Sequence, residues 1–255
     1  MPTEPDNYWA ATKHPWACVL FVLPLLVIYE VGLYATGTEA RNGADAWLRA
    51  GLNEVGIAPA YGAPVLLVSV LLAWGLLRRE GRPTDKVGVW FGMIGESAGF
   101  ALLLLALCQG VWHLLLRADT LLGQPNQRIA FLRMSPGMGE PEPVWGQIIS
   151  FVGAGIYEET LFRLVLFTGL VRLFCWSEGR TSPLGFALAA FASGLLFAGA
   201  HHVGPNGEAF NLYVLSFRTF AGLYFAWLFH VRGFGIAVGA HAAYDVLVGL
   251  ILRHE

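Results

Sequence analysis

Ionisable side chains gather within apolar stretches in the second half of this chain. The group comprises Glu158, Glu159, Arg163, His201, His202, Arg218, His241 and Asp245. Carboxylates and imidazoles can take up and return protons near neutral pH, so this set suits acid–base catalysis. Within a membrane-spanning segment each such group costs about 2.5 to 3.5 kcal/mol on insertion scales, and buried charges therefore tend to mark functional cavities.

The spacing of these residues pairs them on helix faces. Glu159 and Arg163 are four residues apart with the acid first, which is the favourable order for an ion pair on a helix. His241 and Asp245 repeat this interval. Glu158 lies about 100° around the helix from Glu159, so one carboxylate can be held by the arginine while the other points elsewhere. A catalytic carboxylate with a structural partner needs this arrangement.

Long apolar runs must position these side chains. The chain has 255 residues, of which 56% are hydrophobic and 13% charged. Its continuous runs have the length that spans a bilayer, and backbone groups in lipid must be satisfied within the segment, so helices are expected. We predict an all-α polytopic membrane protein, a bundle of about seven transmembrane helices with a range of six to eight. The expected spans are Trp16 to Tyr34, Tyr61 to Leu77, Ala98 to Leu116, Ile148 to Trp176, Pro183 to Ala200, Leu212 to Phe229 and Phe234 to Leu252.

The chain is expected to form one integrated membrane domain with two regions. Residues 1–143 form an N-terminal transmembrane region of about three spans, and residues 144–255 form a core of about four spans. The segment at residues 41–56 is either a helix lying at the membrane interface or a polar loop. The connection at residues 117–143 is long and rich in Pro and Gly, which suits either a lid or a surface loop. Glycine pairs four apart predict close helix packing: Gly95 with Gly99, and Gly235 with Gly239.

Charge and cysteine content exclude other classes of partner. The formal net charge is -2 and no long basic run occurs, so no nucleic-acid partner is expected and the lipid bilayer is the main partner. The three cysteines lack CxxC spacing and indicate neither a disulfide framework nor a zinc cluster. The N-terminus is too polar for a cleaved signal, so the first apolar run is expected to remain as a helix.

Three short motifs carry a resemblance to a known family. EETLFR at residues 158–163, FAGAH at residues 197–201 and HAAYD at residues 241–245 resemble the EExxxR, FxxxH and HxxxN/D motifs of the CPBP family. That family comprises the type II CAAX prenyl endopeptidases and their bacterial relatives, also called Abi or bacteriocin-processing proteins. Each motif alone is weak, but three in this order on successive apolar segments are specific. The resemblance covers about residues 144–252.

The resemblance implies an intramembrane endopeptidase of the glutamic type. Its substrate would be a membrane-associated or prenylated, CAAX-type protein or peptide, and no cofactor or metal is implied. By motif, Glu158 and His201 look like the pair that activates a water, with Glu158 as general base. The resemblance to bacterial relatives also implies an integral protein of the plasma (inner) membrane of a prokaryote.

The remaining motif residues resemble supporting groups. Glu159 and Arg163 look like structural and electrostatic support for the base, and His241 and Asp245 resemble the pair assigned to the oxyanion. Here the third motif ends in Asp, and an ionised carboxylate cannot donate a hydrogen bond. Asp245 must therefore be protonated, or it orients His241 as the donor.

Several alternatives stay open at the sequence level. The acids and Arg163 also suit an ion-pair network that only fixes helix packing. His201, His241 and a glutamate are possible zinc ligands, although the HExxH motif is absent and base catalysis is preferred. A non-enzymatic relative, such as an immunity or scaffold protein, or a small transporter, would also carry buried charges.

Other polar residues are given structural roles. His202 is expected to form a polar helix end, and Phe197 to pack beneath His201. Arg218 must find an anion, and Glu30 is one candidate.

Overall fold

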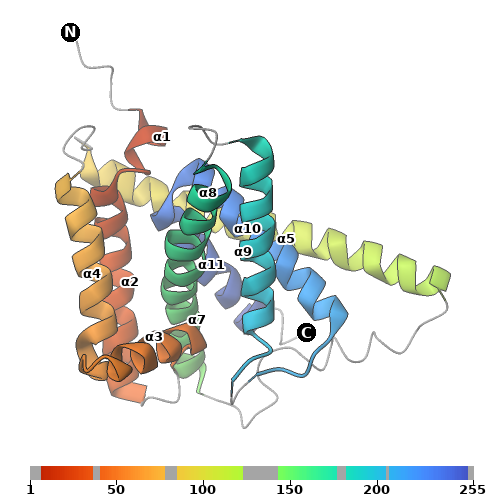
Figure 1. Ribbon diagram of the computed structural model, residues 1–255, viewed down its shortest axis with the longest axis horizontal. Helices are drawn as coiled ribbons and strands as arrows, with labels where there is room; N and C mark the ends of the chain where they lie inside the picture. Colours follow the sequence, from red (N-terminus) through yellow and green to blue (C-terminus); the bar gives the residue numbers. More distant parts are fainter. Residues whose placement is uncertain are drawn as a thin grey trace. The chain divides into compact units, whose positions relative to one another are not determined.

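A computed structural model of the chain describes residues 7–36, 41–77, 85–122, 143–176, 182–204 and 207–251, and every regular element in this part is helical. The elements are α1 (Tyr8–Ala11), α2 (Pro15–Thr36), α3 (Gly43–Glu54), α4 (Pro59–Leu77), α5 (Lys86–Leu122), α7 (Val144–Glu159), η2 (Thr160–Phe167), α8 (Thr168–Phe174), α9 (Pro183–Ala200), α10 (Leu212–Arg232), α11 (Phe234–Val246) and η4 (Leu247–Ile251). Figure 1 shows their course. The predicted all-α class is confirmed.

Four described helices are long and apolar enough to cross a membrane. They are α2, the Lys86–Val111 part of α5, α9 and α10, while Tyr61–Leu77 and Phe234–Gly249 are shorter apolar helices. The expected fourth span is helical from the start of α7 to the end of α8, but its middle is the π-helix η2. These apolar helices identify an integral membrane protein.

The two open predictions for the connections have different outcomes. The segment at residues 41–56 contains α3, so the loop interpretation is wrong, and the position of this helix at the membrane interface stays a prediction. An Asn42 cap and Asp45 in the first turn explain where α3 begins. The segment at residues 117–143 starts inside α5, and its remainder at 123–142 lies outside the described residues.

The chain divides into two compact units. The first unit comprises Met1–Ala101, Pro143–Leu161 and Leu228–Glu255, and the second comprises Leu102–Glu142 and Phe162–Trp227. The predicted division at residue 143 stays a prediction.

The first unit is built around α7. This helix packs against α2, α3 and α11, and α3 also packs against α4 (Figure 1). From Val152 to Glu159 every residue of α7 is buried. Two glycines permit this packing: a Cβ on Gly153 would overlap the Tyr29 ring, and one on Gly155 would lie 2.7 Å from the Val238 carbonyl oxygen of α11.

A buried arginine ties the first helix to the first unit. Arg232 is fully buried, pairs with Glu96 and stacks on Trp9, with 3.8 Å from the guanidinium carbon to the ring centroid. Tyr8 donates to Glu96 at 2.8 Å. Burial and the adjacent Glu96 raise the pKa of Tyr8 to about 12, so the phenol stays protonated as a donor.

Glycines at the start of α11 confirm one of the two packing predictions. A Cβ on Gly235 would lie 2.5 Å from Met93, and one on Gly239 would lie 2.5 Å from the Ser97 hydroxyl. The prediction for the other pair is wrong. Among the described residues nothing lies within 4 Å of a Cβ built on Gly95 or Gly99.

The second unit holds α8, α9 and most of α10. A Cβ on Gly222 of α10 would lie 2.7 Å from the Gly194 Cα of α9, so these two backbones are nearly in contact. The rings of Phe167 and Phe186 meet edge to face with centroids 5.4 Å apart. Small residues and edge-to-face rings therefore set the packing of this unit.

Gly155→Ala is expected to destabilise the protein by about 1 to 3 kcal/mol, because the new methyl group overpacks against the α11 backbone. The measurement is thermal unfolding of the purified protein in detergent. Gly169→Ala in α8 is the matched control, since no described atom lies within 4 Å of its Cβ position. Equal melting temperatures for the two variants would contradict the packing role given to Gly155.

Candidate active site

The imidazole of His241 is the centre of an acidic cluster in the first unit. His241 is 4% exposed and lies on α11. Its Nδ1 lies 2.8 Å from Oε1 of the fully buried Glu159. Because an ionised carboxylate only accepts hydrogen bonds, Nδ1 is the donor in this contact. The bond fixes the ring's rotation and directs Nε2 away from Glu159.

Two further carboxylates face Nε2 of His241. The nearest oxygen of Glu158 lies 3.7 Å away, and the nearest oxygen of Asp245 lies 3.5 Å away. Glu158 is 8% exposed. The predicted proximity of His241 and Asp245 is thus present, and the structure adds both glutamates of the first motif to the same group. An imidazole oriented by one carboxylate, with two others at its second nitrogen, is suited to holding and passing a proton.

Local helix geometry changes one sequence argument. Glu159 ends α7, whereas Arg163 lies in the π-helix η2, so the four-residue interval is not one turn of regular α-helix. A second π-helix, η4, begins two residues after Asp245. π-Helical turns are rare and occur often at functional sites, and here each follows a carboxylate of the cluster. Neither could be inferred from apolar spacing.

His201 and Phe197 lie in the second unit and are positioned by α9. His201 follows the last residue of this helix, and its Nδ1 donates to the Phe197 carbonyl oxygen at 2.8 Å. The two rings meet edge to face with centroids 4.9 Å apart, as predicted. In the neutral ring this bond makes Nε2 the acceptor nitrogen, which is the form a proton-accepting histidine needs.

Arg163 is fully buried in the second unit. Its Nη2 donates to the Gly222 carbonyl oxygen at 3.2 Å, and its guanidinium carbon lies 4.4 Å from the Phe197 ring centroid. Phe197 therefore contacts both His201 and Arg163. Arg163 links the first motif to the second motif through this ring.

The site residues fall into two groups. Glu158, Glu159, His241 and Asp245 lie in the first unit, while Arg163 and His201 lie in the second unit. The predicted pairing of Glu159 with Arg163, and that of Glu158 with His201, each join the two units and stay predictions.

The remaining ionisable residues of the sequence group have structural partners. Arg218 pairs with Glu208 at 2.7 Å, so the suggestion that Glu30 is its anion is wrong. Glu30 instead binds Arg49 at 2.7 Å. His202 lies just after α9, where its Nδ1 donates to the Glu208 carbonyl oxygen at 3.0 Å.

Sequence reasoning missed one side chain of the cluster. The Asn42 Nδ2 donates to Glu158 Oε1 at 2.9 Å. Asn followed by an acidic residue three positions later is a recognisable helix start, but the pattern says nothing about a distant partner. Within the described ranges no group of three or more His, Cys, Asp or Glu side chains has the geometry to hold a metal ion.

Arg163→Lys is expected to destabilise the protein by about 2 kcal/mol, because an ammonium group cannot reproduce the planar contact with Phe197 together with the bond to the Gly222 carbonyl. Denaturant unfolding in detergent measures the effect. Arg172→Lys on the exposed side of α8 is the control, and its midpoint should match that of the wild type. A shift no larger than the control's would show that the buried contacts of Arg163 are replaceable.

Comparison with known proteins agrees with the motifs. Residues 140–247 match the family model described as type II CAAX prenyl endopeptidase Rce1-like. No curated protein and no solved structure gives a match. The matched region contains all three motifs and every site residue except Asn42. Residues 140–247 of this integral membrane protein are therefore similar to the Rce1-like type II CAAX prenyl endopeptidases.

Proposed function

We propose that the protein is a glutamic-type intramembrane endopeptidase in which Glu158 is the general base. The observation that carries this proposal is the buried cluster around His241, whose Nδ1 lies 2.8 Å from Glu159 and whose Nε2 faces Glu158 and Asp245. Buried carboxylates and an imidazole in mutual contact are the groups that peptide hydrolysis requires. The family match over residues 140–247 supports the same reaction class.

In the proposed reaction Glu158 takes a proton from a water molecule. The water oxygen forms a bond to the scissile carbonyl carbon, and the carbonyl oxygen becomes an oxyanion. Collapse of this intermediate re-forms the C=O bond and breaks the C–N bond. The proton held by Glu158 passes to the leaving nitrogen, which departs as an amine.

His241 is proposed as the oxyanion donor. With Nδ1–H donated to Glu159, the ring donates at Nε2 when it carries its second proton, and Asp245 at 3.5 Å is an acceptor that orients this N–H before substrate binds. This role answers the question raised by Asp in the third motif. Asp245 need not donate to the oxyanion, because it acts through His241.

His201 is proposed to share the activation of water with Glu158. Its bond to the Phe197 carbonyl leaves Nε2 as the acceptor nitrogen, which suits a group that receives a proton. Phe197 packs edge to face on this histidine, and Arg163 in turn packs over the Phe197 ring. The pairing of Glu158 and His201 over one water is part of the proposal.

The proposed substrate is a membrane-associated or prenylated, CAAX-type protein or peptide. The matched family is described as prenyl endopeptidases, and helices of spanning length place the chain in a bilayer, where a lipid-modified chain is concentrated. We propose the plasma membrane of a prokaryote as its location, following the resemblance to bacterial relatives.

Glu158→Gln and His201→Ala are each expected to lower cleavage of a prenylated CAAX-type reporter peptide by at least about 100-fold, because each removes a proton-transfer group. Cleavage by the purified full-length protein is measured by mass spectrometry. Glu54→Gln and His113→Ala are the matched controls, since both residues are exposed, and they should cleave at the wild-type rate.

Other outcomes of this assay identify the alternatives. Full cleavage by Glu158→Gln would exclude Glu158 as the base. Loss of wild-type cleavage with a chelator, and its recovery with Zn²⁺, would replace the base mechanism with a zinc-dependent one. Absence of cleavage across a panel of prenylated and unmodified peptides would favour the non-enzymatic or transporter interpretation.

A further inference from the structure

Asn42 connects the first turn of α3 to Glu158. Its Oδ1 accepts from the Ala44 backbone N–H at 2.8 Å, which caps the helix, and its Nδ2 donates to Glu158 Oε1 at 2.9 Å. An amide has one accepting and one donating end, and the two contacts use one each, so its orientation is determined. The same side chain thus starts a helix and holds a buried carboxylate.

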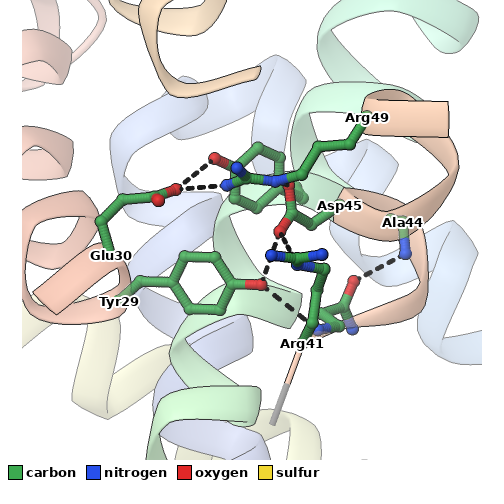
Figure 2. A network of polar contacts seen from close by, with 8 residues as sticks. Tyr29, Glu30, Arg41, Ala44, Asp45 and Arg49 are labelled. Atoms are coloured by element: carbon green, nitrogen blue, oxygen red, sulfur yellow. Dashed lines mark hydrogen bonds and ion pairs between the residues drawn. The ribbon is translucent and has the colours of Figure 1, made fainter. Parts of the chain in front are cut away.

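A buried polar network that includes Tyr29, Asp45 and Arg49 (Figure 2) holds Asn42 in position. Asp45 is fully buried, and its two oxygens accept from Arg49 Nε at 2.6 Å and from the Tyr29 hydroxyl at 2.9 Å. The Asn42 backbone N–H donates to that hydroxyl at 3.2 Å. The peptide unit of Asn42 and the first turn of α3 are therefore fixed to α2.

Arg49 extends this network to α7. It binds Glu30 at 2.7 Å, and Glu30 accepts from the Tyr157 hydroxyl at 3.0 Å. Burial lowers the pKa of Arg49, but the hydrogen bond and charge of Asp45, together with the charge of Glu30, raise it, so the guanidinium stays charged. Buried ion pairs lose much of their attraction to desolvation, so this network is better explained by the geometry it fixes than by stability.

Asn42 is suited to hold a base because it is neutral. A lysine or arginine at 2.9 Å would pair with Glu158 and weaken it as a proton acceptor, whereas an amide aims the carboxylate without a full charge. Oε1 is held by Asn42, and Oε2 faces His241 Nε2 at 3.7 Å. The two oxygens of Glu158 therefore face different groups.

We infer that Asn42 is a positioning residue for Glu158, and that α3 is held against α2 and α7 to present it. This inference rests on the proposed role of Glu158 as the base. It assigns a function to the N-terminal region, which lies outside the three motifs and outside the matched residues 140–247.

The kinetic test uses the purified full-length protein and a prenylated CAAX-type reporter peptide. Asn42→Asp keeps an oxygen to cap α3 but replaces the donor to Glu158 with a second oxygen. We expect kcat to fall about tenfold or more with little change in KM, because the charge-assisted bond to the base is lost and a second carboxylate faces the base. The acid limb of the rate profile should move to higher pH by about one unit, since the ionised form of Glu158 loses its donor and gains a negative neighbour.

The other charged groups of the polar network and of the His241 cluster are unchanged in this comparison. They are Glu30 on α2, Arg41 before α3, Asp45 and Arg49 on α3, Glu159 on α7, and His241 and Asp245 on α11. Asn42→Ser keeps the cap without adding charge and is too short to reach Glu158, so it should show a smaller fall in kcat. Asn53→Asp makes the same chemical change at an exposed position of α3 and should leave kcat and the pH profile unchanged.

A second measurement tests the contact without any substrate. Thermal unfolding is compared for Asn42→Asp, Glu158→Gln and the double variant. Asn42→Asp alone should lower the melting temperature, because two carboxylates then face each other. In the Glu158→Gln background the decrease in melting temperature should largely disappear, because the amide introduced at position 158 donates to the carboxylate introduced at position 42.

The outcomes separate the inference from the proposed function. The positioning role is supported if the double variant melts at nearly the same temperature as Glu158→Gln, and if Asn42→Asp has a lower kcat and a shifted acid limb. Equal losses of stability in both backgrounds, or kinetics that match Asn53→Asp, would overturn it while leaving the base role of Glu158 intact. Full activity of Glu158→Gln would overturn the proposed function and the inference together, even where the unfolding data confirm the contact.

Discussion

The first unit is organised by the need to bury two adjacent carboxylates inside an apolar helix. Glu158 and Glu159 lie where α7 is enclosed on every side, so each must have a polar partner. Glu159 meets His241, and Glu158 meets Asn42. These two contacts join α7 to α11 and to the start of α3, and the glycines of α7 make close packing possible.

His241 contacts residues from two separate motifs. Its ring is fixed by Glu159 from the first motif and lies beside Asp245 from its own motif. The packing of α7 on α11 is close because the Gly155 position leaves no room for a side chain. The close approach of the two backbones and the contact between His241 and Glu159 are therefore set by the same helix pair.

The region outside the matched residues 140–247 also contributes to the structure of the site. α3 is short and amphipathic, and an isolated helix of its length is marginal in water. Its Asn cap, its buried Asp45 and Arg49 and the tyrosine hydroxyls of α2 and α7 replace the hydrogen bonds that water would provide. This polar network lies next to Glu158 and joins two helices that are distant in sequence.

The sequence by itself determined the helical membrane class, most helix positions and the three motifs, because apolar run length and local spacing depend only on neighbouring residues. It also indicated that Asp245 lies beside His241. Only the tertiary structure decided that Glu159 binds His241, that Arg218 pairs with Glu208, and that Asn42 reaches Glu158 across more than a hundred residues. Partner choice among buried polar groups depends on how helices pack, and π-helical turns at η2 and η4 alter which side chains face each other. Neither the packing of the helices nor the position of the π-helical turns is encoded in local spacing.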